Sequence, residues 1–447
     1  VEINRKCYLN QGSSLLNFYS DYAEEFLANR SESLLIPIES RLEQESLVSL
    51  AQSDSCVETV SEKYRFDMDL NPNDPRISTQ NFHGNTQSFQ AWDQFFGTDG
   101  IGEEVVIAII DSGVDLTHDD LKNNKWINPR EIPDNNIDDD GNGFVDDVNG
   151  MTYAPAFDYH NSGQAFKSGK SLPQTWNFPN GHPCNGTYAS EDHGTHVAGL
   201  AAAQLNNAIG VAGVMGKKVR IMSLNVFGPY CGTSSEFISA AIHYASANGA
   251  NIISMSLGGR TGSDPLPADI GSAISQAVNA GAFVLSSAGN TNLNISPSDN
   301  YYPAGFARSI DGMVAVGAID ARNSQKCDFS SHSSTGYVEL AAPGCNGNNY
   351  ILSTVLNNGY GVKDGTSMST PIAAGAAGLV YGLIKSRTRG FPSPAVIEDI
   401  LTGSGRKHAS LEPYFKNGNV VDLVRYYNEV SLRYPVGGPI DGGMKCE

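Results

Sequence analysis

Residues 105–113 have the sequence VVIAIIDSG, in which six apolar residues lead directly into an aspartate, a serine and a glycine. An apolar run without polar alternation is typical of a strand that is buried on both faces of a sheet. Gly113 allows the backbone to turn sharply where the strand ends. We therefore predict a buried strand over 105–110, with Asp111 at its carboxyl end, where the functional loops of parallel sheets lie.

Apolar runs and helical patterns alternate along the chain after this strand. Further strand-like runs occupy residues 219–226, 251–257, 283–286, 313–318 and 338–341. Helical patterns occupy residues 193–205, 234–248 and 269–280. This alternation predicts an α/β fold, in which helices cover both faces of a mostly parallel sheet.

The first part of the chain has a different pattern. Residues 1–80 contain two helical patterns, an alternating stretch and a turn-rich linker. We interpret 1–80 as a small N-terminal α+β unit with its linker, 81–435 as the main domain and 436–447 as a C-terminal tail. Residues 128–186 are rich in Asp, Asn, Gly and Pro without a clear period, which indicates a long ordered loop insertion.

The composition excludes several classes of protein. The chain has 447 residues, 40% of them hydrophobic, and a formal net charge of −19 at pH 7. It is long and apolar enough for a large core, while its negative charge repels nucleic acid and anionic lipid and suits divalent cations. The longest apolar stretch, 371–384, is shorter than the roughly 20 residues of a spanning helix, so we expect no membrane span.

The chain has seven cysteines, an odd number, and no C-x-x-C pair. Zinc ribbons and thioredoxin-like motifs are therefore disfavoured. The cysteines are either a partial disulfide set formed in an oxidising compartment or buried free thiols. Nearest-neighbour pairing would join Cys7 to Cys56, Cys184 to Cys231 and Cys327 to Cys345, with Cys446 left over.

Three residues of the types needed for nucleophilic catalysis occur in the order Asp, His, Ser. Asp111 ends the first strand, His193 opens a small-residue helix, and Ser367 lies at the start of another helix in GTSMSTP, residues 365–371. A serine hydroxyl is a poor nucleophile unless a base takes its proton and an acid holds that base in one tautomer. Free N–H groups at a helix N-terminus can also bind an oxyanion beside the serine. His196 lies one helical turn behind His193 and is interpreted as a packed helix residue.

These three segments, in this order, resemble the subtilisin-like serine proteases, the subtilases. The similarity extends over roughly residues 85–430 and implies a three-layer α/β/α sandwich with a mostly parallel sheet of about seven strands. It implies that Asp111, His193 and Ser367 form a catalytic triad. Asn290, in the segment SAGN, resembles the asparagine that completes the family's oxyanion hole, although an Ala-Gly-Asn turn by itself also occurs in ordinary loops.

The resemblance also implies a substrate cleft. The segment SLGG, residues 256–259, is similar to the family strand that pairs with an extended peptide by strand addition. Tyr301, by its spacing from Asn290, is expected near the base of the S1 pocket, where its bulk favours a small or medium P1 side chain. The expected substrate-binding residues are Ser256, Leu257, Gly258, Gly259, Ala288, Gly289 and Tyr301.

Residues 138–147, DDDGNGFVDD, place oxygen-bearing side chains at alternate positions with a glycine at the sixth, as calcium loops do. Position twelve holds Asn149 rather than Glu, so Asp146 or Asp147 would take the place of the missing bidentate carboxylate. An acidic hairpin without a metal is the alternative. The candidate ligands are Asp138, Asp140, Asn142, Phe144, Asp146 and Asp147.

A second calcium site is implied by the resemblance alone, because residues 205–211 follow the His193 helix as the family's strong calcium loop does. The family adds a side-chain amide from near the mature N-terminus, for which Gln80 and Gln87 are the candidates. Both ions would stabilise loops, since serine catalysis needs no Lewis acid. The ligands carried over are the Asn207 side chain, the Asp120 carboxylate and the carbonyls of Leu205, Ile209 and Val211.

Subtilases are commonly made with a propeptide that assists folding and inhibits the enzyme, and residues 1–80 are loosely similar to the later part of such a unit. This segment is either a propeptide cut near its linker or a permanent extension. We expect a secreted, calcium-stabilised serine endopeptidase, extracellular or periplasmic, that acts on protein or peptide substrates through an acyl-enzyme. The alternatives are a transpeptidase or ligase on the same scaffold and a catalytically silent calcium-dependent binding protein.

Overall fold

The computed structural model describes residues 2–3, 51, 53, 57–59, 72–155, 165–169, 192–228, 232–262, 267–296, 300–333, 335–347 and 350–436. Contacts divide the chain into two compact units, Val1–Met68 and Asp69–Glu447. In the first unit, β1 (Glu2–Ile3) pairs antiparallel with β2 (Val57–Thr59). The two helical patterns predicted there lie, apart from Ala51, outside the described residues.

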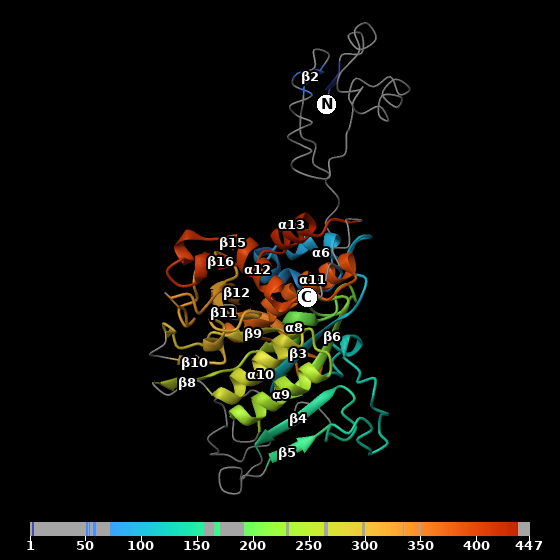
Figure 1. The fold of residues 1–447 in the computed structure, drawn as a ribbon. Coiled ribbons are helices and arrows are strands. Elements are labelled where there is room, and N and C mark those ends of the chain that lie inside the picture. The colour runs from blue at the N-terminus through green and yellow to red at the C-terminus, as the bar shows by residue number, and fades with distance from the viewer. Residues whose placement is uncertain are drawn as a thin grey trace, which may run out of the picture. The chain divides into compact units, whose positions relative to one another are not determined.

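The second unit is built on a sheet of ten strands (Figure 1). In chain order they are β3 (Val105–Asp111), β4 (Gly150–Pro155), β5 (Ala165–Ser168), β6 (Val219–Asn225), β7 (Ile252–Met255), β9 (Phe283–Ser287), β11 (Met313–Asp320), β12 (Leu340–Cys345), β15 (Arg406–Lys407) and β16 (Asn419–Val420). Across the sheet the order is β15-β16-β12-β11-β9-β7-β3-β6-β4-β5. Neighbours from β16 to β4 are parallel, whereas β15 and β5 run antiparallel to the strands beside them.

The predicted α/β fold with a mostly parallel sheet is confirmed, but the sheet is wider than the seven strands expected. The short strands β15 and β16 add to one edge, and β5 adds to the other. Because β4 and β5 lie inside 128–186, the prediction of loop for that whole region was wrong. Strands this short or this polar leave no period for a sequence pattern to detect. Residues 156–164 and 170–186 of the insertion lie outside the described residues.

Two further two-stranded sheets accompany the main sheet. One joins β8 (Gly259–Gly262) to β10 (Asn300–Tyr302), and the other joins β13 (Ile351–Val355) to β14 (Gly359–Lys363). Both pairs are antiparallel. They contain or border residues of the candidate site, so the site is framed by more than the carboxyl ends of the main strands.

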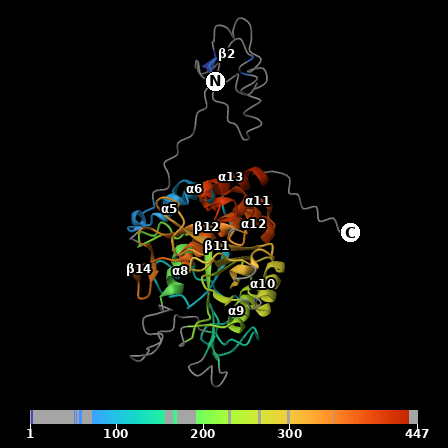
Figure 2. The same ribbon diagram turned by 90° about the vertical axis from the view of Figure 1, so that its left-hand side faces the viewer.

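Helices cover both faces of the main sheet (Figures 1 and 2). They are α5 (Phe82–Asn85), α6 (Ser88–Phe96), α8 (His193–Ala202), α9 (Ser235–Ala247), α10 (Ala268–Asn279), α11 (Thr366–Thr388), α12 (Pro394–Ser404) and α13 (Leu423–Arg433). Short 3-10 helices span Ile77–Thr79, Lys122–Asn124, Ala304–Phe306, Ala409–Leu411 and Lys416–Gly418. One apolar core joins the sheet to α6, α8, α11, α12 and α13, and a second core joins it to α9 and α10. The result is the three-layer arrangement expected from the alternating sequence.

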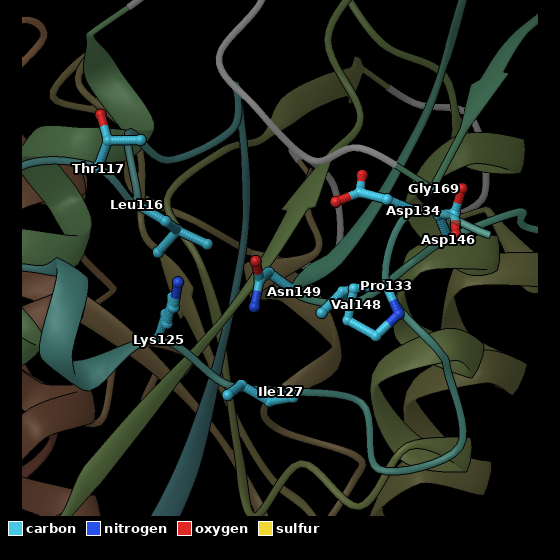
Figure 3. Close-up of a pocket in the computed structure, with 10 residues that line it drawn as sticks. All are labelled: Leu116, Thr117, Lys125, Ile127, Pro133, Asp134, Asp146, Val148, Asn149 and Gly169. Atoms are coloured by element: carbon cyan, nitrogen blue, oxygen red, sulfur yellow. The ribbon is translucent and has the colours of Figure 1, made fainter. Parts of the chain in front are cut away.

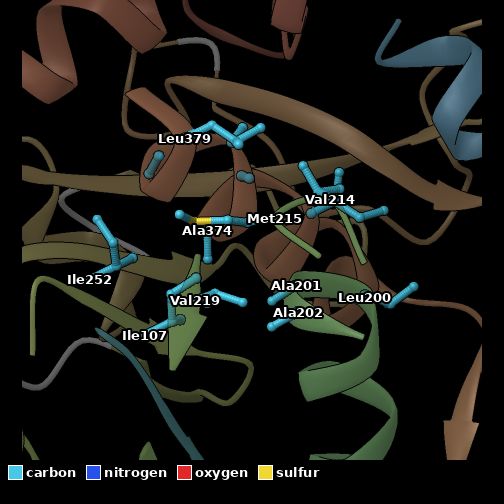
Figure 4. Packing of buried hydrophobic residues seen from close by; sticks show 14 of the residues in the cluster. Ile107, Leu200, Ala201, Ala202, Val214, Met215, Val219, Ile252, Ala374 and Leu379 are labelled. Carbon is cyan, nitrogen blue, oxygen red and sulfur yellow. The ribbon is translucent and has the colours of Figure 1, made fainter. Parts of the chain in front are cut away.

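Helix α11 runs through the first core and carries Ser367 in its first turn. Figure 4 shows Leu379 of this helix among buried side chains that include Met215 and Val214. A Cβ added at Gly378 would lie 2.5 Å from Met215 Sδ, so a larger residue there would displace the Met215 side chain. By length and composition α11 could span a membrane, but 94% of its apolar window is buried inside the protein. It is therefore a core helix that holds Ser367 on a rigid support.

One of the three proposed cysteine pairs lies within the described residues. Cys327 and Cys345 form a disulfide with a Cα–Cα distance of 6.3 Å and a sequence separation of 18. The nearest-neighbour pairing is thus confirmed for this pair. Cys7, Cys56, Cys184, Cys231 and Cys446 lie outside the described residues.

Candidate active site

The carboxyl end of β3 and the start of α8 bring Asp111 and His193 together. The imidazole Nδ1 donates to Asp111 Oδ1 at 2.8 Å and lies 3.0 Å from Oδ2. Asp111 is 1% exposed, and its Oδ1 also accepts the Ser112 backbone N–H at 2.7 Å. A carboxylate can only accept, so the contact holds the proton on Nδ1 and leaves Nε2 as an acceptor. This is the tautomer that a general base requires.

The two elements approach each other closely because two glycines face across them. A Cβ added at Gly194 would lie 2.3 Å from Gly113 O and 3.2 Å from Asp111 Oδ1. Gly113 itself has φ of 86°, a conformation that favours glycine. Gly113 and Gly194 therefore allow the two segments to approach closely enough for the Asp111 carboxylate to reach the His193 imidazole.

The surroundings of His193 act on its charge in opposite directions. Burial disfavours the imidazolium, but attraction to the Asp111 carboxylate and the hydrogen bond to it outweigh burial and raise the pKa of His193. The ion pair between Asp192 and Lys363, at 3.0 Å, contributes two smaller effects that oppose each other. The base is thus strengthened by its carboxylate partner. His196, as predicted, is buried in the helix, where its Nε2 donates to the Ile351 carbonyl at 3.1 Å.

Ser367 lies at the N-terminal end of α11, two residues after Gly365. The φ of Gly365 is 145°, and its N–H donates to the Gly344 carbonyl at 2.9 Å. The Ser367 hydroxyl donates to the Ser256 carbonyl at 3.3 Å, and the Ser256 hydroxyl donates back to the Ser367 carbonyl at 2.9 Å. In this rotamer no hydrogen bond joins Ser367 to His193 among the described residues. The Thr366 N–H donates to Asn290 Oδ1 and the Met368 N–H to the Gly365 carbonyl, so among the described residues the first turn leaves the Ser367 N–H available to an anion.

The side chain of Asn290 is anchored by the residue that precedes the serine. Its Oδ1 accepts the Thr366 backbone N–H at 2.8 Å and the Thr366 hydroxyl at 2.9 Å. The Thr366 hydroxyl also accepts the Gly289 N–H at 3.1 Å. With Oδ1 engaged, Nδ2 faces the backbone at Gly365, where an added Cβ would lie 3.1 Å from it. Sequence reasoning missed Thr366 as the residue that orients this amide donor.

The predicted substrate-binding segments converge around Tyr301. Cβ atoms added at Gly258 and Gly289 would lie 2.4 Å from Tyr301 Cε1 and 2.8 Å from Tyr301 Cζ. The phenol ring therefore occupies the space between the segment after β7 and the segment after β9. Burial, together with Tyr302, raises the pKa of Tyr301 to about 12, so the ring is neutral at physiological pH. Ser256, Leu257 and Ala288 are buried beside it, and Gly259 begins β8.

A cavity of about 480 Å³ lies elsewhere, beside the acidic insertion (Figure 3). It contains none of the four predicted catalytic residues. Figure 3 shows Asp134, Asp146 and Gly169 on one side of it and Leu116, Thr117 and Lys125 on the other. Its size reflects the path of the insertion, and it carries no part of the catalytic geometry.

The loop after α8 contacts Asp120, which lies between β3 and β4. Asp120 Oδ1 accepts the Asn207 side-chain amide at 2.8 Å, and Asp120 Oδ2 accepts the Val211 N–H at 3.0 Å and the Tyr360 hydroxyl at 2.9 Å. Leu205 and Ile209 lie in the same loop. These contacts place the predicted side chains of Asp120 and Asn207 in direct contact with each other.

The N-terminal residue that faces this loop is Asp74, which sequence reasoning missed. Asp74 is 2% exposed and accepts the N–H groups of Asn206 and Asn207 at 3.0 and 3.4 Å. Burial, and to a lesser degree the Asp120 carboxylate, raise the pKa of Asp74, and a bound cation would offset both effects. Gln80, one of the two candidates for the additional amide ligand, donates from Nε2 to the carbonyls of Ala212 and Leu352 and accepts the Ala212 N–H at Oε1. Gln87, the other candidate, immediately precedes α6.

In the acidic insertion the carboxylates form two groups. Oxygens of Glu131, Asp140 and Asp147 lie within 4.8 Å of one another. Asp138 instead accepts the N–H groups of Asn142 and Gly143, and Asp146 accepts those of Asn135 and Asn136. Phe144 packs its ring under the Lys167 ammonium at 4.2 Å. Two of the converging carboxylates also shape the loop backbone, because Glu131 Oε1 accepts the N–H groups of Asp139 and Asp140, and Asp140 Oδ1 accepts that of Asn142.

Glu131 is the member of the converging group that the calcium-loop pattern did not include. It is 6% exposed, and its Oε2 is buried without a hydrogen-bond partner among the described residues. Burial raises the pKa of Glu131, and the neighbouring Asp147 and Asp140 carboxylates raise it further. Arg130 pairs with Asp140 at 3.2 Å from an exposed position. Three carboxylates in this arrangement fit a hard divalent cation.

Comparison with known proteins agrees with this geometry. Residues 102–417 match the sequence model described as the Subtilase family. The chain is 31% identical over 335 residues to thermitase from Thermoactinomyces vulgaris, covering 75% of this chain and 94% of thermitase. It is 32% identical over 390 residues to an extracellular protease from Xanthomonas campestris, covering 82% of this chain and 58% of the relative. A solved protease from Pseudoalteromonas arctica superimposes with a TM-score of 0.58 at 26% identity, covering 80% of this chain and 99% of that one.

The family match covers both Asp111 and Ser367 and the parallel strands from β3 to β12, and it ends just before the short edge strand β16. A further relative, 29% identical over 377 residues, is named a thermophilic serine proteinase. The chain therefore belongs to the subtilase family of serine endopeptidases.

Proposed function

We propose that Ser367, His193 and Asp111 act as the nucleophile, general base and orienting acid of this endopeptidase. The single observation that carries the proposal is the Asp111–His193 hydrogen bond at 2.8 Å, which leaves Nε2 free to accept a proton. For attack, the Ser367 hydroxyl exchanges the Ser256 carbonyl for Nε2. The Oγ–carbonyl bond forms as the proton moves to His193, which then donates it to the leaving amine. Water repeats the sequence on the acyl-enzyme and releases the acid.

The oxyanion that forms during attack is stabilised by two donors. Asn290 Nδ2 is the first, because Thr366 holds the amide by its oxygen. The backbone N–H of Ser367 is the second, at the N-terminus of α11. Donors held in place before the reaction stabilise developing charge without reorganisation. Labelling of Ser367 by a fluorophosphonate tests this proposal and is developed in the Discussion.

An extended peptide would add to the segment after β7 and place its P1 side chain toward Tyr301. The ring already fills the space between Gly258 and Gly289, which supports a shallow S1 pocket that accepts small or medium side chains. The expected substrate-binding residues remain Ser256, Leu257, Gly258, Gly259, Ala288, Gly289 and Tyr301.

Replacing Tyr301 by glycine is expected to deepen the S1 pocket. The ratio of kcat/KM for Phe or Leu at P1 to that for Ala should rise at least about tenfold, because a hydrophobic pocket gains about 1–3 kcal/mol from added apolar contact. A P1 peptide library measures this ratio. Tyr302→Phe is the matched control and should keep the wild-type preference. A wild-type enzyme that already cleaves best after Phe or Leu would contradict the proposed pocket.

Calcium is proposed at both acidic positions. Asp74, Asp120 and Asn207, with the carbonyls of Leu205, Ile209 and Val211, would hold one ion. Glu131, Asp140 and Asp147 would hold the other. In each case the ion supplies positive charge among buried carboxylates and fixes a loop, while the catalytic steps stay with the protein's own residues. Because both loops pack on α8 or the sheet edge, their order supports the active site indirectly.

Chelation of calcium is expected to lower the melting temperature of the full chain by about 5–10 °C, the size of effect that saturating binding gives. Asp74→Asn should reduce this calcium-dependent shift because it removes a buried ligand charge. Asp119→Asn is the matched control, since Asp119 is exposed and pairs with Lys122 at 2.6 Å. Differential scanning calorimetry with and without calcium measures the shift. An Asp74→Asn variant that keeps the full shift would exclude Asp74 as a ligand.

We further propose that the enzyme is secreted and that the first compact unit, Val1–Met68, is the propeptide-like part of the 1–80 segment. The support for secretion is the extracellular relative named above, together with a disulfide, which is typical of oxidising compartments. The support for a propeptide-like unit is that Val1–Met68 forms its own set of contacts. N-terminal sequencing of the active enzyme decides between cleavage in the linker and a permanent extension.

A further inference from the structure

The ammonium group of Lys326 sits among four oxygens. Its Nζ lies 2.9 Å from Asn292 Oδ1, 3.1 Å from Cys327 O, 3.4 Å from Asp328 O and 3.0 Å from Ser330 O. The Tyr414 ring lies below it at 5.4 Å. Burial lowers the pKa of Lys326, the direction expected for an ammonium that has exchanged water for protein oxygens. A charged group surrounded by carbonyl and amide oxygens has the surroundings of a bound monovalent cation.

Three of these oxygens are backbone carbonyls of one tight turn, in which the Ser330 N–H donates to the Cys327 carbonyl at 2.9 Å. Carbonyl dipoles that point at a common centre repel one another unless a positive charge occupies that centre. The fourth oxygen, on Asn292, comes from the segment that carries Asn290. The positive charge of Lys326 therefore holds the turn to the segment that carries Asn290.

Backbone hydrogen bonds also connect this turn to the segment that carries Asn290. The Ser331 N–H donates to the Gly289 carbonyl at 2.9 Å, and the Asn292 N–H donates to the Phe329 carbonyl at 2.7 Å. These bonds flank Asn290 on both sides. A displacement of the turn would move the backbone on either side of the proposed oxyanion donor.

The turn is also connected to the other oxyanion donor. Cys327 is linked by its disulfide to Cys345, and the neighbouring Gly344 carbonyl accepts the Gly365 N–H at 2.9 Å. Gly365 precedes Ser367 by two residues. The turn of residues 327–330 thus pairs directly with the backbone on either side of Asn290 and is connected to the Ser367 segment through Cys345 and Gly344.

We infer that Lys326 is a positioning residue for the oxyanion hole, in which its ammonium serves as a tethered cation that holds the 327–330 turn against the Asn290 segment. The inference rests on the proposed role of Asn290. It predicts an effect on the transition state rather than on substrate binding, because the oxyanion exists only during the reaction. A free cation of similar size should replace the ammonium if the side chain is shortened.

The test compares Lys326→Ala and Lys326→Met in the full chain. Both variants should lose about tenfold in kcat with KM within about twofold, less than the 10²–10³ for outright loss of an oxyanion donor. Ammonium or potassium chloride should restore kcat in Lys326→Ala, where the space is open, and not in Lys326→Met, where the side chain fills it. Tetramethylammonium chloride at the same ionic strength controls for screening. An unchanged kcat in Lys326→Ala, or a loss that neither small cation restores, would overturn the inference.

Two further variants keep the test decisive. Lys407→Ala is the matched control, since Lys407 also donates to a backbone carbonyl and an asparagine oxygen but lies on β15, and it should keep wild-type kcat. Asn292→Gly removes the amide oxygen and suits the φ of 52° at that position. It should lower kcat in the same direction, with no further loss when combined with Lys326→Ala, and additive losses would contradict the inference. If the wild-type chain is active and both Lys326→Ala and Asn292→Gly keep its kcat, the positioning role fails and the proposed function stands. If the wild-type chain is inactive, the proposed function fails as well.

Discussion

Ser367→Ala is expected to reduce kcat for a peptide substrate by about 10⁶-fold while leaving the fold intact. The size is the one known for removal of a subtilisin nucleophile rather than one obtained from this chain. The reason is that the hydroxyl forms the only covalent bond to the substrate, and the His193 base has no other nucleophile within the constellation to activate. Measurement of kcat and KM on a chromogenic peptide, with calorimetry for the fold, gives both quantities.

Ser369→Ala is the matched control for this result. Ser369 lies two residues further along α11, is fully buried, and its hydroxyl has no hydrogen-bond partner among the described residues. Its loss should therefore leave kcat within about twofold and the stability nearly unchanged. A Ser367→Ala enzyme that keeps a tenth or more of wild-type kcat, after contaminating protease is excluded, would contradict the assignment of the nucleophile.

Replacing Asn290 by leucine is expected to lower kcat by about 10²–10³-fold, with KM changed only a few-fold. This range is the one known for the oxyanion amide of subtilisin rather than one obtained from this chain. Leucine has the same branched arrangement of side-chain heavy atoms but no donor or acceptor, so it removes the bond to the oxyanion and the two bonds from Thr366. Because the oxyanion appears only in the transition state, the loss falls on kcat.

A double variant separates this role from a structural one. In Ser367→Ala the oxyanion does not form by serine attack, so adding Asn290→Leu should cost much less than it does in the wild type. Asn123→Leu, at an exposed position remote from the site, controls for a new apolar side chain. A fall in kcat/KM that arises entirely from KM would show that Asn290 binds substrate rather than the oxyanion.

The parts of the fold that followed from sequence were those with strong local patterns. The run 105–110 became β3, and the small-residue helix after His193 became α8, because burial on both sides demands continuous apolar residues. The contact between Asp111 and His193 could be expected because functional loops gather at the carboxyl ends of parallel strands. The Cys327–Cys345 pairing followed from their short separation.

The parts that did not follow depend on segments that meet only in the folded chain. Asp74 reaches the loop at Asn207 across more than a hundred intervening residues, and no local period connects them. Glu131 lies outside the ten-residue calcium-type pattern but turns its carboxylate into it. Lys326 contacts Asn292 through a turn that has no distinctive sequence. Strands β15 and β16 have two residues each, too few for any periodicity.

The central claim is that Ser367 is the activated nucleophile of a working endopeptidase. Reaction of the purified full chain with a fluorophosphonate, with and without calcium, followed by intact mass, peptide mapping and N-terminal sequencing, tests it most directly. The predicted result is one label per active chain, located on Ser367, absent from Ser367→Ala and reduced when calcium is removed. A folded chain that takes no label even after its N-terminal unit is removed, or that is labelled elsewhere, would contradict the claim and indicate a catalytically silent binding protein.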